Sequence, residues 1–299
     1  MRTAAIGIGS NSLRMLIANV EEEKLERLGR YREGLRVFAA LDEAGNISSE
    51  MLEQAADSIE TFAKEAIKQQ ADTIHLFATS AVRDANNSDQ LEKILFDRTG
   101  LRLEVCSGDE EAKLSFWGAT SGKPSGMIDI GGGSTEIVVG DHQHIHYGYS
   151  FQLGAVRLFR MFPVTSDANA YQVIAYAKSL IEPHLANYRS FLADEWIGVG
   201  GTFTTSAAFV QRKPWDDRRG VHGFSLKQDH VMEAIRMLAP MPVEDRKALP
   251  FLQPQRADII VHGLAILAAC MEVFELPQII VSEYGNLEGY LKKHYLYKK

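Results

Sequence analysis

The stretch AAIGIGSNSLRMLIANV, residues 4–20, decides the fold of this chain. An apolar run leads into a polar Gly-Ser-Asn-Ser break at residues 9–12, and apolar Leu13, Met15 and Ile17 follow at alternate positions. Because alternation with a period of two is typical of a strand, the stretch predicts a strand, a tight turn and a second strand. Successive backbone N–H groups in such a turn form a nest for an anion, and serine and asparagine side chains add donors.

An alternative interpretation treats the same stretch as a dinucleotide-binding fingerprint, because Gly7, Gly9 and Ser12 have a similar spacing. That fingerprint needs a helix directly after the turn, since the helix N-terminus holds the pyrophosphate. The residues after Ser12 alternate like a strand instead, which argues against an oxidoreductase of the Rossmann type.

The pattern of the opening stretch returns in the second half of the chain. In GMIDIGGGSTEIVVGD, residues 126–141, a strand ends in a Gly/Ser turn and a second strand leads back. A third glycine-rich turn lies in EWIGVGGTFTTSAAF, residues 195–209, where a strand ends at Gly198 to Gly201 and Thr202 is expected to cap a helix. The chain therefore repeats one phosphate-type hairpin in each half.

The bulk properties favour a two-lobed protein of average soluble composition. The 299 residues are 45% hydrophobic and 24% charged, with a formal net charge of −7. This balance argues against a nucleic-acid surface, so an anionic substrate needs local N–H groups, Arg or Lys side chains, or a divalent metal. The apolar run at 259–274 is too short for a bilayer span and predicts a buried helix.

The expected location is the cytoplasm, with neither a membrane nor a nucleic acid as partner. The N-terminus lacks the pattern of a signal peptide. Cys106 and Cys270 lie in apolar runs without a second cysteine or histidine at metal-ligand spacing, which predicts two buried thiols in a reducing compartment.

Seven short motifs follow one another along nearly the whole chain. They are GSNS at 9–12, ATSAVRDANN at 78–87, SGDEEA at 107–112, DIGGGSTE at 129–136, LGAVRL at 153–158, GVGGTFTT at 198–205 and RADIIVHGLAIL at 256–267. In this order the motifs resemble the exopolyphosphatase and guanosine pentaphosphate phosphohydrolase family, which has the actin-like (ribonuclease H-like) ATPase superfold.

The resemblance implies an α/β fold of two lobes with a cleft between them. One lobe would span residues 1–122 and the other residues 123–283, with a C-terminal helix at about 284–299 packing back on the first lobe. Longer members have a further helical region that helps to hold polymer. A short form such as this chain is therefore expected to hold long chains less well.

The resemblance also assigns roles to individual residues. It places the general base at Glu111, although acids in the first turn of a helix also interact favourably with its dipole. It places Mg²⁺, or Mn²⁺ instead, at Asp129 with help from Glu136, and a charged phosphate contact at Arg83. The alternatives are a surface salt bridge for Arg83 and a solvent-facing strand position for Glu136. Phosphate oxygens are expected at the two hairpins, at Gly9, Ser10, Asn11, Ser12, Gly131, Gly132, Gly133 and Ser134. A nucleotide or other ligand is expected at the third turn, at Gly200, Gly201 and Thr202.

Three positions depart from the pattern of the relatives. Most relatives have Asp where this chain has Gly7, and that Asp is thought to help bind the metal. Leu287 replaces an Arg in GNLEG, and Lys113 follows EEA where Arg is usual. Because loss of a supporting group commonly costs about 10- to 100-fold in metal affinity or activity, the sequence predicts altered activity.

The function that the resemblance implies is hydrolysis of a phosphoanhydride. Water is expected to attack the terminal phosphorus of inorganic polyphosphate, or the 5′ phosphate of guanosine pentaphosphate, with a terminal phosphate between the two hairpins. Two alternatives stay open: a non-catalytic protein that senses polyphosphate or a guanosine alarmone, and an ATP-using enzyme of the same superfold. Pairing is common in relatives, so a homodimer is also expected.

Overall fold

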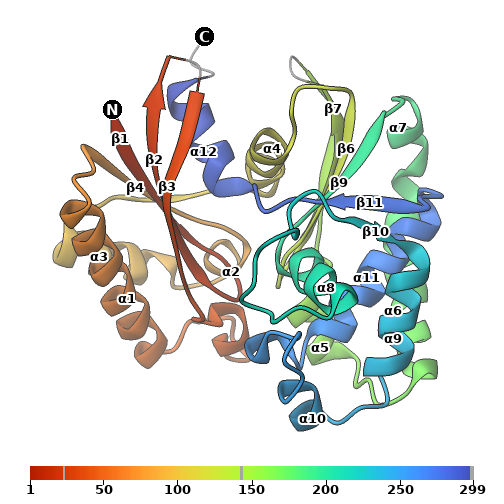
Figure 1. Ribbon diagram of the computed structural model, residues 1–299. Coiled ribbons are helices and arrows are strands. Elements are labelled where there is room, and N and C mark those ends of the chain that lie inside the picture. Colours follow the sequence, from red (N-terminus) through yellow and green to blue (C-terminus); the bar gives the residue numbers. More distant parts are fainter. Residues whose placement is uncertain (23, 142–143, 297–299) are drawn as a thin grey trace. The chain divides into compact units, whose positions relative to one another are not determined.

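The computed structural model describes residues 1–22, 24–141 and 144–296. It divides the chain into two compact units, of which unit 1 is Met1–Gly118 with Asn286–Lys299 and unit 2 is Ala119–Gly285. Each unit has one mixed sheet with helices packed on it (Figure 1). Among the described residues, we find no helix that combines the length and apolar character of a membrane span.

Unit 1 is built on a five-stranded sheet. Its elements are β1 (Arg2–Ile8), β2 (Leu13–Glu21), β3 (Lys24–Glu33), the 3₁₀ helix η1 (Val37–Ala40), α1 (Ser49–Lys68), β4 (Thr73–Ala78), α2 (Ser80–Arg83), α3 (Ser88–Thr99), β5 (Leu103–Val105), α4 (Gly108–Ala119) and α12 (Asn286–Tyr295). The strand order is β3-β2-β1-β4-β5, in which β1, β2 and β3 pair antiparallel and β4 and β5 run parallel to β1. The predicted strand, turn and strand of residues 4–20 are confirmed as β1 and β2.

The burial of the strands follows from their places in this sheet. Central β1 is buried from Thr3 to Ile8, as expected for a strand that is covered on both faces. On one face, Tyr31 of β3 donates a hydrogen bond to Glu65 of α1 at 3.2 Å. On the other face, Arg27 of β3 forms an ion pair with Glu288 of α12 at 2.5 Å. Helices α1 and α12 therefore cover opposite faces of the sheet.

Unit 2 repeats the same topology and adds one strand. Its elements are β6 (Ser125–Ile130), β7 (Thr135–Gly140), β8 (Ile145–Phe151), α5 (Ala155–Met161), α6 (Asp167–Ile181), η2 (Glu182–His184), α7 (Leu185–Arg189), β9 (Glu195–Val199), α8 (Gly201–Gln211), β10 (Ser225–Lys227), α9 (Gln228–Leu238), α10 (Val243–Lys247), η3 (Pro254–Arg256), α11 (Ile260–Val273) and β11 (Gln278–Val281). The order β8-β7-β6-β9-β11 matches that of unit 1, with β10 antiparallel at the edge. The hairpins β1–β2 and β6–β7 thus occupy equivalent places.

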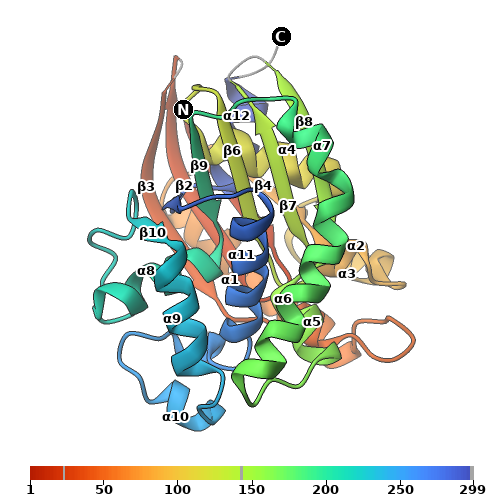
Figure 2. The same ribbon diagram turned by 90° about the vertical axis from the view of Figure 1, so that its right-hand side faces the viewer.

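The core of unit 2 is organised around α11. Figure 2 shows this helix in front of the strands, with α6 on one side and α9 on the other. All of its residues are buried except Glu272, which forms an ion pair with Lys178 of α6 at 2.9 Å. The prediction of a buried helix in residues 259–274 is confirmed. Cys270 lies in this helix, and burial raises the pKa of its thiol to about 12.

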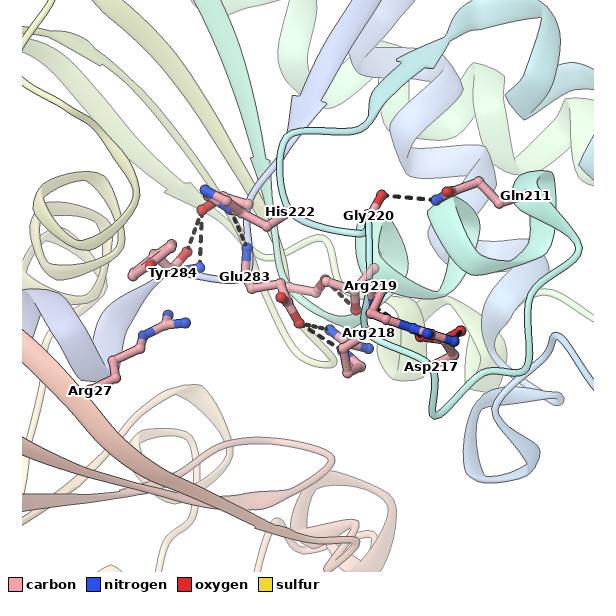
Figure 3. A network of polar contacts seen from close by, with 12 residues as sticks. Arg27, Gln211, Asp217, Arg218, Arg219, Gly220, His222, Glu283 and Tyr284 are labelled. Atoms are coloured by element: carbon pink, nitrogen blue, oxygen red, sulfur yellow. Dashed lines mark hydrogen bonds and ion pairs between the residues drawn. The ribbon is translucent and has the colours of Figure 1, made fainter.

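The segment between α8 and β10 is held in place by a polar network (Figure 3). Arg218 Nε donates to Glu283 Oε1 at 2.7 Å, and the backbone N–H of Glu283 donates to His222 Nδ1 at 3.4 Å. Within the segment, the guanidinium of Arg219 holds the pKa of the Asp217 carboxyl well below its usual range. The network fixes this segment to the residues that follow β11.

Two short segments follow β4 and β5. The residues after β4 form the short helix α2, because Val82 and Arg83 donate backbone hydrogen bonds to the Thr79 carbonyl. Cys106 lies just after β5, and its N–H donates to the carbonyl of Ala78 in β4 at 2.9 Å. The prediction that both thiols are buried is confirmed.

Candidate active site

The two phosphate-type hairpins are closed by the same backbone hydrogen bond. Gly9 N–H donates to the Ser12 carbonyl at 3.1 Å, and Gly131 N–H donates to the Ser134 carbonyl at 2.9 Å. A Cβ atom on Gly9 or Gly131 would lie only 3.2 or 3.0 Å from that carbonyl oxygen. Glycine at these two places therefore permits a turn tighter than a side chain would easily allow.

The first hairpin is anchored by segments on either side of it. The carbonyl of Ser10 accepts a bond from Phe38 N–H at 3.0 Å, and that of Asn11 accepts one from Arg36 N–H at 3.3 Å. The hydroxyl of Ser10 bonds that of Ser80 at 2.6 Å. Asn11 Oδ1 is buried without a hydrogen-bond partner within the described part of the chain. The turn is therefore held by its backbone carbonyls and by the Ser10 hydroxyl.

Glu111 is the one buried acid among the three in the first turn of α4. Its side chain is 9% exposed, and its Oε2 accepts a hydrogen bond from Arg83 Nη1 at 3.0 Å. The helix start is capped by Ser107, whose hydroxyl accepts the N–H of Glu110 at 3.2 Å. Because another residue performs the capping and Glu111 faces inward, its position fits a chemical role better than a capping role.

Arg83 contacts the predicted base directly. Besides Glu111, its Nη1 donates to the Cys106 carbonyl at 3.0 Å, and only 19% of its side chain is exposed. The alternative of a surface salt bridge therefore does not describe it. Ser80 and Arg83 share the short helix α2, so this helix is bonded to the first hairpin at one end and to Glu111 at the other.

A second acidic group of unit 1 lies nearby but is occupied by a lysine. Carboxylate oxygens of Glu104 and Glu110 and the sulfur of Cys106 lie within 4.8 Å of one another. Lys293 of α12 forms ion pairs with both carboxylates. Burial, with Glu110 beside it, raises the pKa of the Cys106 thiol. We therefore interpret this group as an ion-pair cluster that docks α12.

The second hairpin is braced by the start of α5. The N–H groups of Val156 and Arg157 donate to the Gly132 carbonyl at 2.9 and 3.0 Å, and Arg157 Nε donates to the Gly133 carbonyl at 2.7 Å. A Cβ atom on Gly154 would lie 2.3 Å from the Gly132 carbonyl oxygen. The LGAVRL motif thus supports the glycine turn, a role that the sequence did not reveal.

Asp129 and Glu136 form a buried pair of carboxylates on this hairpin. They are register partners across β6 and β7, so their side chains share one face with Cβ atoms about 5 Å apart. Asp129 is 8% exposed and Glu136 only 1%, so Glu136 is not solvent-facing. Ser150 donates a hydrogen bond to Glu136 at 2.7 Å. Two buried carboxylates favour a cation beside them, and their oxygen atoms fit Mg²⁺ or Mn²⁺.

The third turn brings the start of α8 against Asp129. Gly200 has φ 97°, and a Cβ on it would lie 2.8 Å from Asp129 Oδ1, so both conformation and space require glycine. The prediction that Thr202 caps the helix is wrong, because the N-cap is Gly200. The Thr202 side chain is buried and packs where a Cβ on Gly263 of α11 would lie.

Arg256 is a residue of this corner that the sequence analysis missed. A Cβ on Gly201 would lie 1.8 Å from Arg256 Cζ, so the guanidinium rests on the glycine at the start of α8. Helix N-termini attract anions, and an arginine adds to that attraction. The signal was present, since Arg256 opens the RADIIVHGLAIL motif.

Gly7 and Leu287, two positions that depart from the pattern of the relatives, are neighbours in the structure. A Cβ on Gly7 would lie 2.9 Å from Phe77 Cζ and 3.3 Å from Leu287 Cδ2. The Phe77 ring stacks on Tyr290 with centroids 4.4 Å apart. An apolar contact of β4 and α12 therefore fills the space that a carboxylate at residue 7 would need.

Comparison with known proteins places this geometry in a class and a family. The class is an α/β fold of two mixed sheets with phosphate-type hairpins, and the expected α/β class is confirmed. The sequence pattern of the Ppx/GppA phosphatase family matches residues 16–298, and the chain belongs to this family. Both the predicted family and the predicted hydrolase class are thereby confirmed.

Two curated relatives and one solved structure illustrate the similarity. Exopolyphosphatase 2 of Mycobacterium tuberculosis is 33% identical, over 96% of this chain and 97% of that protein. The guanosine-5′-triphosphate,3′-diphosphate pyrophosphatase of Vibrio parahaemolyticus is 27% identical, over 96% of this chain and 58% of that protein. The structure of the Aquifex aeolicus PPX-GPPA enzyme superposes with a TM-score of 0.83 at 25% identity, covering 98% of this chain and 99% of that one.

The apolar corner at Gly7 generates a prediction about stability. Gly7→Asp should lower the free energy of unfolding by about 2–4 kcal/mol, because the carboxylate would press on Phe77 and Leu287 without a partner. Gly7→Ala is the control for the steric part alone and should cost less. Urea unfolding followed by circular dichroism measures both changes.

A double variant tests whether the two departures are coupled. Leu287→Arg supplies a guanidinium for the new carboxylate. The Gly7→Asp/Leu287→Arg protein should therefore lose less free energy of unfolding than the sum of the losses in the two single variants. A Gly7→Asp protein with the urea midpoint of the parent would contradict this account of the corner.

Proposed function

We propose that this chain releases orthophosphate from the end of inorganic polyphosphate or the 5′ phosphate of guanosine pentaphosphate. The water oxygen forms a bond to the terminal phosphorus while the bond from phosphorus to the bridging oxygen breaks. The proton of the water passes to a Glu111 oxygen, and the leaving phosphate keeps the electron pair. The names of the relatives in M. tuberculosis and V. parahaemolyticus support both substrates.

The observation that carries the proposal is the environment of Glu111. A general base must be held in one orientation, and Arg83 does this by a direct bond at 3.0 Å. Arg83 belongs to the same helical turn as Ser80, which bonds the first hairpin. The residue that would accept the proton and the turn that would hold phosphate oxygens are therefore connected by α2.

Asp129 and Glu136 are the residues that would hold a divalent metal. Bound there, Mg²⁺ or Mn²⁺ would neutralise negative charge on the phosphate oxygens, which is where charge resides during phosphoryl transfer. Residue 7 offers no ligand in this chain, so the described carboxylates of unit 2 would carry this role. The glycine turn beside them, braced by α5, would add backbone N–H donors to the phosphate.

No finding favours the alternatives. A non-catalytic sensor would not need the buried base, and Glu111 is retained with its arginine. The prediction of a nucleotide or other ligand at Gly200–Thr202 stays a prediction, with Arg256 as a further residue of that corner.

The decisive experiment measures orthophosphate release from polyphosphate and guanosine pentaphosphate, each with Mg²⁺ and with Mn²⁺. Glu111→Gln should lower kcat by about 10²- to 10⁴-fold, because the general base is lost. Glu110→Gln is the matched control: it is the preceding acid in the same helical turn, but it pairs with Lys293. Equal activity of the Glu111→Gln and Glu110→Gln proteins would overturn the assignment of the base.

The metal proposal predicts a change in metal demand. Asp129→Asn should raise the Mg²⁺ concentration for half-maximal activity by about 10- to 100-fold, since a charged oxygen ligand is replaced by a neutral one. Asp194→Asn, an exposed change in the same unit, serves as control. Calorimetric titration with Mn²⁺ in the absence of substrate gives a second readout. Unchanged metal dependence in both assays would place the metal elsewhere.

We also propose a cytoplasmic location and a homodimer. The two free, buried thiols suit a reducing compartment and support the first, and pairing among relatives of the family motivates the second. Static light scattering tests the dimer, because one chain has a mass of 33.3 kDa and a pair has twice that mass. A measured mass near that of one chain would contradict the homodimer.

A further inference from the structure

One face of β2 and β3 carries four arginines, Arg14, Arg27, Arg30 and Arg32, which we call the arginine row. In the β2–β3 register, Arg14 lies opposite Arg32, Leu16 opposite Arg30, and Ala18 opposite Arg27. Register partners point to the same face of a sheet, and so do residues two apart on one strand. The four side chains therefore project from the face on which α12 packs.

A β-bulge in β3 places all four arginines on the same face of the sheet. The register shifts between Ile17 and Ala18, which leaves Leu28 as an extra residue on β3. In a regular strand without the bulge, Glu26 would share a face with Arg30, and Arg27 would point the other way. The ion pair of Arg27 with Glu288 of α12 agrees with the shifted register. The bulge thus places Arg27 instead of Glu26 on this face.

The row begins beside the first hairpin. Arg14 stands two residues after Ser12, its Nη2 lies 3.8 Å from where a Cβ on Gly9 would be, and it donates to Asn286 at 3.2 Å. From there Arg32 lies across on β3, and Arg30 follows about 7 Å along that strand. Figure 2 shows β3 at the outer edge of the sheet of unit 1.

The outer part of the row is open to solvent. Arg30 and Arg32 are exposed, whereas Arg14 and Arg27 are half-buried. The Arg30 side chain has no hydrogen bond or ion pair with any residue that the structure describes. A guanidinium can fork onto two oxygens of one phosphate, so evenly placed arginines suit a ligand with a phosphate at each repeat.

Since the proposed function makes the Gly9–Ser12 turn a site for terminal phosphate, we propose that the arginine row binds the following phosphates of an inorganic polyphosphate chain. A single-stranded nucleic acid fits this face less well, because such ligands are held by aromatic side chains between the charges. The residues between the arginines include Leu16 and Ala18 of β2 and the bulged Leu28 of β3, and the one aromatic residue of β3, Tyr31, faces α1. The row therefore provides charge without a stacking platform.

The test compares a double variant of the row with a charge-matched control. Arg30→Gln/Arg32→Gln should lower the ratio of kcat/KM for long-chain polyphosphate over tripolyphosphate by about 5- to 20-fold, because the short substrate ends near the hairpin. Lys93→Gln/Arg102→Gln removes the same charge from exposed positions on α3 and the loop after it, and should leave the ratio unchanged.

Binding gives a readout that does not depend on turnover. In a Glu111→Gln background, the logarithm of the affinity for long-chain polyphosphate should fall linearly with the logarithm of the salt concentration. The magnitude of this negative slope should become smaller by roughly 0.7–0.9 for each lost arginine, as for other polyanions. The control pair should keep the slope of the parent.

Three outcomes separate this inference from the proposed function. If tripolyphosphate is hydrolysed but the row variant and the control pair both bind long chains as tightly as the parent, the row proposal fails. The arginines then only prevent the edge strand from pairing with another strand. If no substrate is hydrolysed, the proposed function fails, and the binding slopes still decide the row. If polyuridylic acid binds as tightly as polyphosphate and loses affinity in the row variant alone, the row is a nucleic-acid surface and the proposal is overturned.

Discussion

The backbone hydrogen bond that closes each glycine hairpin is the constraint on which the candidate site depends. Gly9 to Ser12 and Gly131 to Ser134 form the same bond, and in both turns the nearest obstacle to a side chain is the carbonyl that accepts it. Each turn is then held from outside, the first by the segment that enters η1 and the second by the start of α5. A turn braced in this way presents its amides in a fixed arrangement, so binding an anion requires little ordering of the backbone.

The chemistry attached to these turns comes from side chains that are nearly removed from water. Glu111 meets Arg83, and Asp129 lies beside Glu136 on adjacent strands. A buried carboxylate needs a cationic partner or hydrogen bonds, and each of these acids is placed where one can be supplied. Gly7 and Leu287 show the opposite solution, since the space for a carboxylate is filled there by packed apolar side chains. The family pattern has therefore been altered at one corner, while the proposed base Glu111 and the carboxylate pair remain.

Much of the fold could be predicted because its signals are local. Alternating strands around a Gly/Ser break predicted both hairpins, and the apolar run at 259–274 predicted the core helix of unit 2. The predictions were less accurate where neighbours decide the structure. The short α2 forms because Thr79 accepts bonds from Val82 and Arg83, and Thr202 packs on α11 instead of capping α8. Arg256 escaped attention because its contact with Gly201 joins positions that are 55 residues apart in the sequence.

The sequence by itself determined the family, the repeated hairpin and the identity of the acids, since motif order and residue spacing are properties of the chain alone. Tertiary structure decided which of the neighbouring acids is enclosed with an arginine, because burial depends on what packs against a helix turn and not on the turn itself. It likewise decided that Arg27 shares a face with Arg30 and Arg32. One extra residue in a strand reverses the facing of everything beyond it, and only the pairing with β2 shows where that residue lies.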